Sequence, residues 1–185
     1  MMSTTHAAVG VTLAASTLWV APELVVPAAL GAMAGGIFPD LDVAYAAHRK
    51  TLHYPELYWP FVAVGFAVAL LSPSSVTVGA AFFLLSAAVH SVTDVFGGGL
   101  GSRPWENDDQ RGVYAHRRGR WIPPRRWIRY DGSPEDLVVV AVFSLPGILL
   151  YDGLVRRLTL AMLSVSAVYV VLRKPIGRLG DRVDV

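Results

Sequence analysis

The amino-acid sequence predicts an all-α fold, in which about six helices form a membrane-embedded bundle and a long polar loop separates the fourth helix from the fifth. Of the 185 residues, 54% are hydrophobic and only 16% are charged, whereas a typical soluble domain has roughly 25% charged residues. The hydrophobic residues are gathered into long blocks without charge, which favours helices over the alternating strands of a membrane barrel. The alternative is a soluble protein whose helices pack around one core.

Six helices are expected from the positions of these blocks and from the turn residues between them. The charge-free runs are about 15–18 residues long, slightly below the ~20 residues of a full membrane span. Aromatic residues at the ends of the runs, such as Trp19, Trp59 and Tyr151, are suited to extend the spans into the membrane interface. The expected helices cover residues 6–21, 24–38, 56–71, 76–96, 136–151 and 157–173.

The composition also limits the chemistry and the partners. The chain has no cysteine, so any metal ion must be held by histidine and carboxylate side chains. The formal net charge is only +2, so no global basic field attracts nucleic acid. Trp105, Trp121 and Trp127 lie among arginines and could stack on bases, but aromatic and basic residues at a membrane surface explain this pattern better. We therefore expect no nucleic-acid partner and a single helical membrane domain over residues 1–185.

The charged residues are distributed unevenly between the two ends of such a bundle. If the helices alternate in direction, one end carries only the short turns at residues 21–23, 72–75 and 152–156. The other end gathers most of the 16 Lys and Arg residues, on the N-terminus, residues 39–55, residues 97–135 and the C-terminal tail. The positive-inside rule assigns this end to the cytoplasm. We expect a multi-pass protein of the cytoplasmic (inner) membrane, with its N-terminus and the polar Arg-rich loop 97–135 on the cytoplasmic side.

The same alternation brings all five histidines to the polar end. His90 and Asp94 are four residues apart, so on a helix they share one face, where an imidazole and a carboxylate can bind one cation. A His–Asp ion pair is the alternative for these two residues. Asp40 and Asp42 follow Pro39 in an extended turn, where two carboxylates can bind a cation or, alternatively, cap a helix.

The remaining histidines lie in less regular segments. His48 and His53 flank two basic residues in a loop, and neutral imidazoles suit zinc, iron, nickel or copper. The alternative for this loop is a basic surface that meets anionic lipid headgroups. His6 precedes the first expected helix and is a further candidate ligand. His116 lies among arginines, which disfavour a cation, and is expected at the surface or facing a substrate.

Taken together, these segments resemble a known family, the membrane-bound, LexA-regulated metal-dependent hydrolases of the inner membrane. The likeness covers roughly the first hundred residues and rests on ordered motifs: T-H at 5–6, G-G-I-F-P-D-L-D at 35–42, H-R-K-T-L-H at 48–53, and H-S-V-T-D at 90–94 with glycines at 97–101. The His and Asp pattern of that family is similar to the all-helical, zinc-dependent phospholipase C and P1 nuclease group. Lys50, Tyr54 and the Arg-rich loop depart from the family pattern.

The resemblance implies a set of ligand and catalytic candidates: His6, Asp40, Asp42, His48, His53, His90 and Asp94. The expected cofactor is a divalent metal ion, with zinc as the first candidate. Whichever of Asp40 and Asp42 is not fully used in coordination is expected to act as the catalytic base. Arg49 and Arg103 are expected to bind phosphate oxygens, because a guanidinium group matches phosphate with two parallel hydrogen bonds.

Three functions remain open on the sequence. The leading hypothesis is a metal-dependent hydrolase that acts on a phosphoester or a phospholipid headgroup at the cytoplasmic face, where a metal lowers the pKa of bound water towards ~7. The second is a non-enzymatic integral membrane protein whose basic loops bind a partner or anionic lipid. The third is a transporter that uses His90 and Asp94 as an ion relay, which requires both residues deep in the bilayer.

Overall fold

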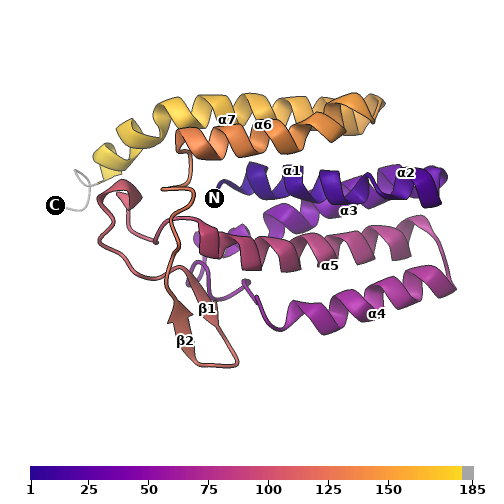
Figure 1. Cartoon of the computed structure of the whole chain (residues 1–185), viewed down its shortest axis with the longest axis horizontal. Coiled ribbons are helices and arrows are strands. Elements are labelled where there is room, and N and C mark those ends of the chain that lie inside the picture. Colours follow the sequence, from indigo (N-terminus) through magenta and orange to yellow (C-terminus); the bar gives the residue numbers. More distant parts are fainter. Residues whose placement is uncertain (181–185) are drawn as a thin grey trace.

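The computed structural model describes residues 1–180 and is mostly helical (Figure 1). Within these residues the α-helices are α1 (Ser3–Ala14), α2 (Thr17–Val20), α3 (Val25–Ile37), α4 (Tyr58–Leu71), α5 (Ser75–Thr93), α6 (Pro134–Leu149) and α7 (Gly153–Gly180). Short 3-10 turns are η1 (Pro22–Leu24), η2 (Phe38–Ala44), η3 (Asp94–Phe96) and η4 (Pro104–Glu106). An antiparallel hairpin of β1 (Val113–Ala115) and β2 (Arg120–Ile122) lies between α5 and α6, with Tyr114 opposite Trp121.

The predicted all-α fold is confirmed, with two differences in detail over this part of the chain. The first predicted helix, residues 6–21, begins earlier and is divided into α1 and α2. The hairpin inside residues 97–135 was not expected, because its three-residue strands are too short to give a periodic signal. Arg182, one of the basic residues assigned to the C-terminal tail, lies outside the described residues.

The last helix also continues beyond residue 173, where the sequence predicts its end. Pro175 lies inside α7 without terminating it. Contacts with the polar segment hold these final turns, since Arg173 donates to the Asp131 carboxylate at 2.9 Å and its guanidinium lies 5.5 Å from the centre of the Trp105 ring. Tertiary contacts therefore override the local preference against helix.

Glycines allow α1, α3 and α5 to pack closely. Gly31 and Gly35 are one helical turn apart on α3, and a Cβ atom at either position would clash with a backbone carbonyl of α5, that of Gly79 or of Phe83. Gly36 makes a similar approach to the backbone of Ala7 on α1. Small residues spaced in this way let helix backbones approach within a membrane, where the hydrophobic effect does not drive helices together. The close packing fixes the ends of α3 and α5 relative to one another.

The remaining helices pack around these three. The α4 helix lies along α5, and the α6–α7 pair covers α1 (Figure 1). Side-chain hydrogen bonds join the layers: the Thr12 hydroxyl donates to the Phe143 carbonyl of α6 at 2.8 Å, and the hydroxyls of Thr4 and Ser166 on α7 are 2.7 Å apart. These bonds satisfy polar groups that lie between apolar helices.

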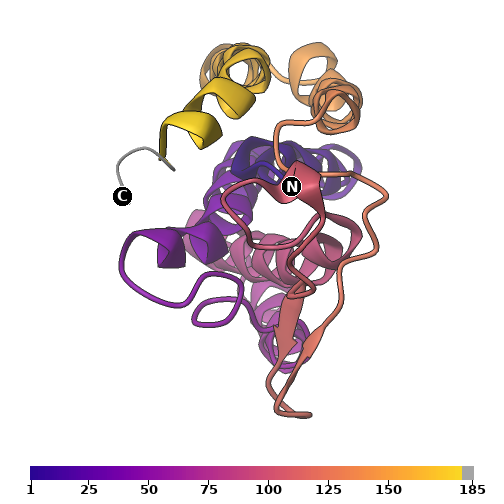
Figure 2. The ribbon, with the colours of Figure 1, turned by 90° about the vertical axis from the view of Figure 1, so that its left-hand side faces the viewer.

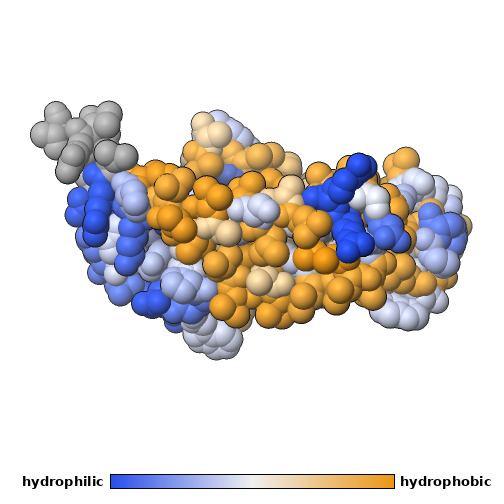
Figure 3. All heavy atoms as spheres, turned by 90° about the horizontal axis from the view of Figure 1, so that it is seen from above, coloured by the Kyte–Doolittle hydropathy of each residue, from blue (hydrophilic) through white to orange (hydrophobic). Residues whose placement is uncertain are grey.

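Three helical segments are long and apolar enough to cross a membrane by length and composition: Pro22–Ala44, Ser75–Phe96 and Gly153–Arg178. Figure 3 shows a broad apolar band over α6 and α7 between a hydrophilic end and a second, smaller hydrophilic patch. Between Arg157 and Arg173 the sequence of α7 has no charged residue, which corresponds to about 24 Å of helix. The hydrocarbon core of a bilayer is ~30 Å thick, and long Arg side chains can reach its boundary from this spacing.

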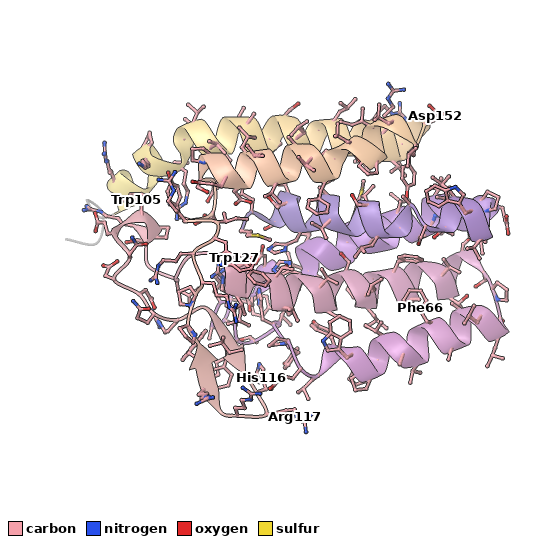
Figure 4. The ribbon with its side chains drawn as sticks, viewed as in Figure 1. Phe66, Trp105, His116, Arg117, Trp127 and Asp152 are labelled. Carbon is pink, nitrogen blue, oxygen red and sulfur yellow. The ribbon has the colours of Figure 1, made fainter. Side chains whose placement is uncertain are left out.

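The long polar segments gather at one end of the bundle, as the alternating arrangement of helices predicts. The N-terminus, the segment between α3 and α4, and the segment between α5 and α6 lie at this polar end, while Asp152 lies at the opposite end (Figures 1 and 4). Figure 2 looks onto the polar end and shows α7 and the segment after α3 on the same side of the N-terminus. The alternating direction of the helices thus brings distant parts of the chain together.

Candidate metal centre

Four side chains at the polar end converge on one point. The Nε2 atoms of His53 and His90 are 3.2 Å apart. The Oδ1 atom of Asp40 lies 3.5 Å from Nε2 of His53 and 3.3 Å from Nε2 of His90. The Oδ2 atom of Asp94 lies 3.4 Å and 3.5 Å from the same two nitrogens. All four residues are within reach of a single metal ion, and His53, His90 and Asp94 are fully buried.

The helices place these residues. His90 and Asp94 are one turn apart at the end of α5, so both project from the face that packs on α3. The end of α3 passes at Pro39 into the η2 turn, which presents Asp40 and Asp42. The His90 imidazole donates from Nδ1 to the Gly36 carbonyl at 2.6 Å, so the close packing of α3 also orients this ring. The Ser3 hydroxyl at the start of α1 donates to Oδ2 of Asp40 at 2.5 Å.

Asp42 lies behind His53 rather than beside the four converging atoms. Its carboxylate accepts a bond from Nδ1 of His53 at 3.1 Å, from Nδ1 of His48 at 2.8 Å and from the Leu52 backbone N–H at 3.2 Å. A carboxylate that accepts from the far nitrogen of an imidazole fixes the ring orientation and leaves Nε2 directed at a metal. Asp42, His48 and His53 also form a second, smaller group with the spacing of metal ligands.

Asp94 has two hydrogen-bond donors on its outer side and a buried arginine beside it. Its Oδ1 atom accepts from Nε2 of His6 at 2.9 Å and from the Met1 α-amino group at 3.1 Å. Its Oδ2 atom lies 3.2 Å from Nε of Arg49 but has no hydrogen-bond partner among residues 1–180. The His6 ring stacks on the His90 ring with centroids 3.7 Å apart. His6 therefore contacts Asp94 and His90 and does not itself belong to the four converging residues.

Charge is concentrated in this small volume. Burial alone would lower the pKa of the His53 imidazole, but its hydrogen bonds to the carboxylates of Asp40, Asp42 and Asp94 raise that pKa to about 10. Arg49 is buried, and its backbone has a φ of 58°, a left-handed conformation that is uncommon for a residue with a side chain. Its Nη1 donates to the Gly98 carbonyl at 2.6 Å, so the guanidinium is fixed beside Asp94.

The other two candidates are placed differently from the converging residues. Arg103 forms an exposed ion pair with Glu106 at 3.3 Å. His116 is expected at the surface or facing a substrate, and the structure has it half-buried. Its Nε2 lies 2.8 Å from the Lys50 carbonyl oxygen and 3.1 Å from the His53 carbonyl oxygen. An N–H on this nitrogen donates to both carbonyls. Figure 4 shows it on the hairpin, next to the segment that precedes α4.

The hairpin therefore supports the turn that carries His53. The Tyr114 backbone N–H donates to the Arg49 carbonyl at 3.0 Å, and the Arg117 N–H donates to the Glu56 carboxylate at 3.0 Å. Sequence reasoning missed this contact and also the bond from Ser3. The signal for Ser3 was present, because it lies three residues before His6 on one helical face. No local pattern marks His116, since its partners are more than sixty residues earlier in the sequence.

A cavity of 630 Å³ reaches the four converging residues at Asp40, the one of the four that lines it. Asp40, His48 and Arg49 line it on one side, and Val165, Tyr169 and Arg173 of α7 line it on the other. Arg173 forms a two-bond ion pair with Asp131, at 2.9 Å and 3.1 Å. Arg103 is not among the lining residues within the described chain.

Comparison of the chain with protein-family profiles, with curated proteins and with solved structures finds no match. The protein is therefore described from its fold and its candidate site alone. It is a mostly helical protein with three candidate membrane helices. At one end it has a buried cluster of His and Asp residues with the spacing needed to hold a metal ion.

Proposed function

We propose that the protein is a membrane-bound, metal-dependent hydrolase whose metal ligands are Asp40, His53, His90 and Asp94. One observation carries the proposal: of the six separations between the four converging atoms, five are between 3.2 and 3.5 Å, and the sixth, between the Asp40 and Asp94 oxygens, is within 4.8 Å. The edge of a regular tetrahedron is 1.63 times the distance from its centre to a corner. Edges of this length correspond to a centre about 2.0–2.1 Å from each atom, which matches zinc–nitrogen and zinc–oxygen bonds.

The chemistry of the donors supports the same ion. Two imidazoles and two carboxylates form a borderline-hard set that suits Zn²⁺ and neighbouring transition metals, in a chain without cysteine. The buried Oδ2 atom of Asp94 accepts no hydrogen bond in the described residues, although it forms an ion pair with Nε of Arg49 at 3.2 Å. A buried carboxylate oxygen without a hydrogen bond is costly, and a metal ion bound there would give it a direct partner.

Each neighbouring residue then has a role that follows from its contacts. Asp42 orients His53, and the Gly36 carbonyl orients His90. His6 and Arg49 balance the charge of Asp94. The proposed ligand set therefore assigns Asp42, His48 and His6 to supporting positions around four direct ligands. Such outer contacts hold the imidazoles in the tautomer that leaves Nε2 free to bind a metal.

The proposed reaction is the hydrolysis of a phosphoester. A bound divalent ion supplies a water molecule of lowered pKa and polarises a phosphoryl oxygen. Water adds to phosphorus as the bond to the leaving oxygen breaks, and the proton lost by water is returned to that leaving oxygen. Asp40 is the converging residue that reaches the cavity, with 14% of its side chain exposed. Its Oδ2 atom, bonded to the Ser3 hydroxyl, is not one of the converging atoms, and it is the proposed proton acceptor. Arg49 also lines the cavity and is the proposed contact for a phosphate oxygen.

The resemblance to the inner-membrane hydrolases supports both the activity and the location. The motifs that carry the resemblance contain all four proposed ligands. The basic residues at the polar end support a cytoplasmic position for the centre by the positive-inside rule. A second function is favoured by one observation: Arg117, Arg118 and Arg120 on the hairpin are exposed. A non-enzymatic protein would use such a surface to bind anionic lipid or a partner.

Metal content tests the proposal. We expect purified wild-type protein to contain one equivalent of a divalent metal, and Asp94→Asn to lose it while its circular dichroism stays helical. Asp152→Asn, at the opposite end and exposed, is the matched control and should retain the metal. Phosphoester hydrolysis should be lost in Asp94→Asn and in chelator-treated wild type, and should return when zinc is added to the latter. Equal metal content in wild type and Asp94→Asn would exclude the proposed centre.

A further inference from the structure

The cavity beside the proposed centre has a mixed lining. Close to the centre it is lined by Asp40, His48 and Arg49. The α7 helix contributes the polar Tyr169 and Arg173 and also the apolar Val165 and Ile176, and Val43 of η2 is a third apolar lining residue. A ligand that fills the cavity must therefore have a polar part and an apolar part.

The apolar part of the cavity lining is continuous with the outer surface of the molecule. Val43, Val165 and Ile176 line the cavity, yet they are 68%, 60% and 51% exposed. They therefore form a mouth between η2 and α7, and Figure 2 shows these two segments on the same side of the polar end. The mouth lies beside α7, a candidate membrane span of which only 17% is buried inside the protein. Val165 lies near the middle of this candidate span and Ile176 lies near its end. An opening rimmed by these exposed apolar residues therefore faces the acyl chains as well as the headgroup region.

The size of the cavity sets a limit on what it holds. At 630 Å³ it lies within the range of cavities that hold small molecules, ~300–1,000 Å³. A headgroup and the first part of a chain fit this volume, whereas a whole membrane lipid is larger, so the rest of the chain must leave through the mouth. The apolar mouth gives the chain a route into the bilayer that avoids water.

We infer, on the basis of the hydrolase function proposed above, that this cavity binds a membrane amphiphile with a phosphoester headgroup. The headgroup lies over Asp40 and Arg49, and the chain leaves past Val43, Val165 and Ile176 along α7. The amphiphile enters sideways from the bilayer. A soluble phosphoester shares the headgroup chemistry but gains nothing from the mouth.

Binding of non-hydrolysable phosphonates to the zinc-loaded protein in detergent tests this inference without turnover. Two probes with the same headgroup are compared by titration calorimetry: a long-chain phosphonolipid and the soluble headgroup phosphonate. We expect Val165→Trp, which fills the mouth, to weaken binding of the long-chain probe at least about tenfold and to leave the soluble probe unchanged. Ile176→Trp is a second variant of the same kind. Val171→Trp is the matched control, because Val171 is 73% exposed on α7 and is not among the lining residues of the described chain.

The possible results separate the two proposals. Stronger binding of the long-chain probe to wild type, lost in both mouth variants and kept in Val171→Trp, supports the inference. Equal affinity for the two probes, or equal effects of Trp at positions 165 and 171, overturns it. Hydrolysis of the corresponding phosphate esters is measured separately. Tight binding of the long-chain probe without any hydrolysis would overturn the proposed function and leave the amphiphile site standing, and hydrolysis without chain preference would do the opposite.

Discussion

The division between direct ligands and supporting residues makes Asp42 the most informative position to change. Its carboxylate accepts three hydrogen bonds, from His48, His53 and the Leu52 backbone, and only the bond from Nδ1 of His53 leads to the proposed metal. Asp42→Asn keeps the shape of the side chain but replaces one acceptor oxygen with an NH₂ group, which cannot accept from an imidazole N–H. One of the two imidazoles must then lose its partner.

The expected loss follows from that single contact. A hydrogen bond to a charged group contributes roughly 1.5–3 kcal/mol, and the loss of a supporting contact to a metal ligand lowers metal affinity by about 10–100-fold. The two ranges agree, since a tenfold change corresponds to about 1.4 kcal/mol. We therefore expect Asp42→Asn to bind zinc about 10–100-fold more weakly than wild type, while Asp94→Asn loses measurable binding.

Competition against a chromophoric chelator measures these affinities. Asp109→Asn serves as control, because Asp109 also forms strong bonds, to Arg111 at 2.6 and 3.1 Å, but lies outside the centre. Loss of zinc in Asp42→Asn as complete as in Asp94→Asn would mean that Asp42 is a direct ligand. Unchanged affinity would refute the orienting role of Asp42.

Four further predictions follow from other contacts. His116→Ala removes the N–H donated to the His53 carbonyl, and we expect a lower melting temperature and weaker zinc binding than in wild type. Partial recovery in His116→Gln, which keeps a donor, would distinguish this contact from simple packing. The raised pKa of His53, about 10 in the metal-free protein, means that this ring is protonated at neutral pH. Zinc binding at pH 7 should therefore release at least one proton, which calorimetry in buffers of different ionisation enthalpy detects; a buffer-independent heat would contradict the geometry. In the metal-free protein the charged ring stabilises the fold below its unfolded pKa of 6.5, and that contribution is lost as the pH rises through about 10. Gly35→Ala forces a Cβ atom against the Phe83 carbonyl, and we expect it to destabilise the fold by about 1–3 kcal/mol. Gly101→Ala, whose nearest contacts are 3.9 Å away, should be close to neutral in the same thermal assay.

The helices and their arrangement could be predicted because charge-free blocks are long and well separated in this chain. The pairing of His90 with Asp94 follows from their spacing of four residues, which places both side chains on one face of a helix. The gathering of polar segments at one end follows from alternation alone. These features depend on local sequence or on simple topology.

The distinction between Asp40 and Asp42 could not be predicted in the same way. The two residues are two apart in a 3-10 turn, and only the packing of that turn on α5 directs one carboxylate inward and the other behind His53. The burial of Arg49 could not be predicted either, because a basic residue in a basic loop is normally solvated. The support from His116 depends on a hairpin that docks on a distant turn. Such contacts are non-local and leave no periodic pattern.

The origin of the four converging side chains has a consequence for biogenesis. They come from three stretches of sequence, and the earliest and latest are more than fifty residues apart. During synthesis the set of metal ligands is incomplete until residue 94 has been added and α5 has packed against α1 and α3. The ion therefore cannot template the first helices, and the glycine contacts between α1, α3 and α5 must bring them together unaided. The metal ion then binds last, after the helices of the bundle have packed.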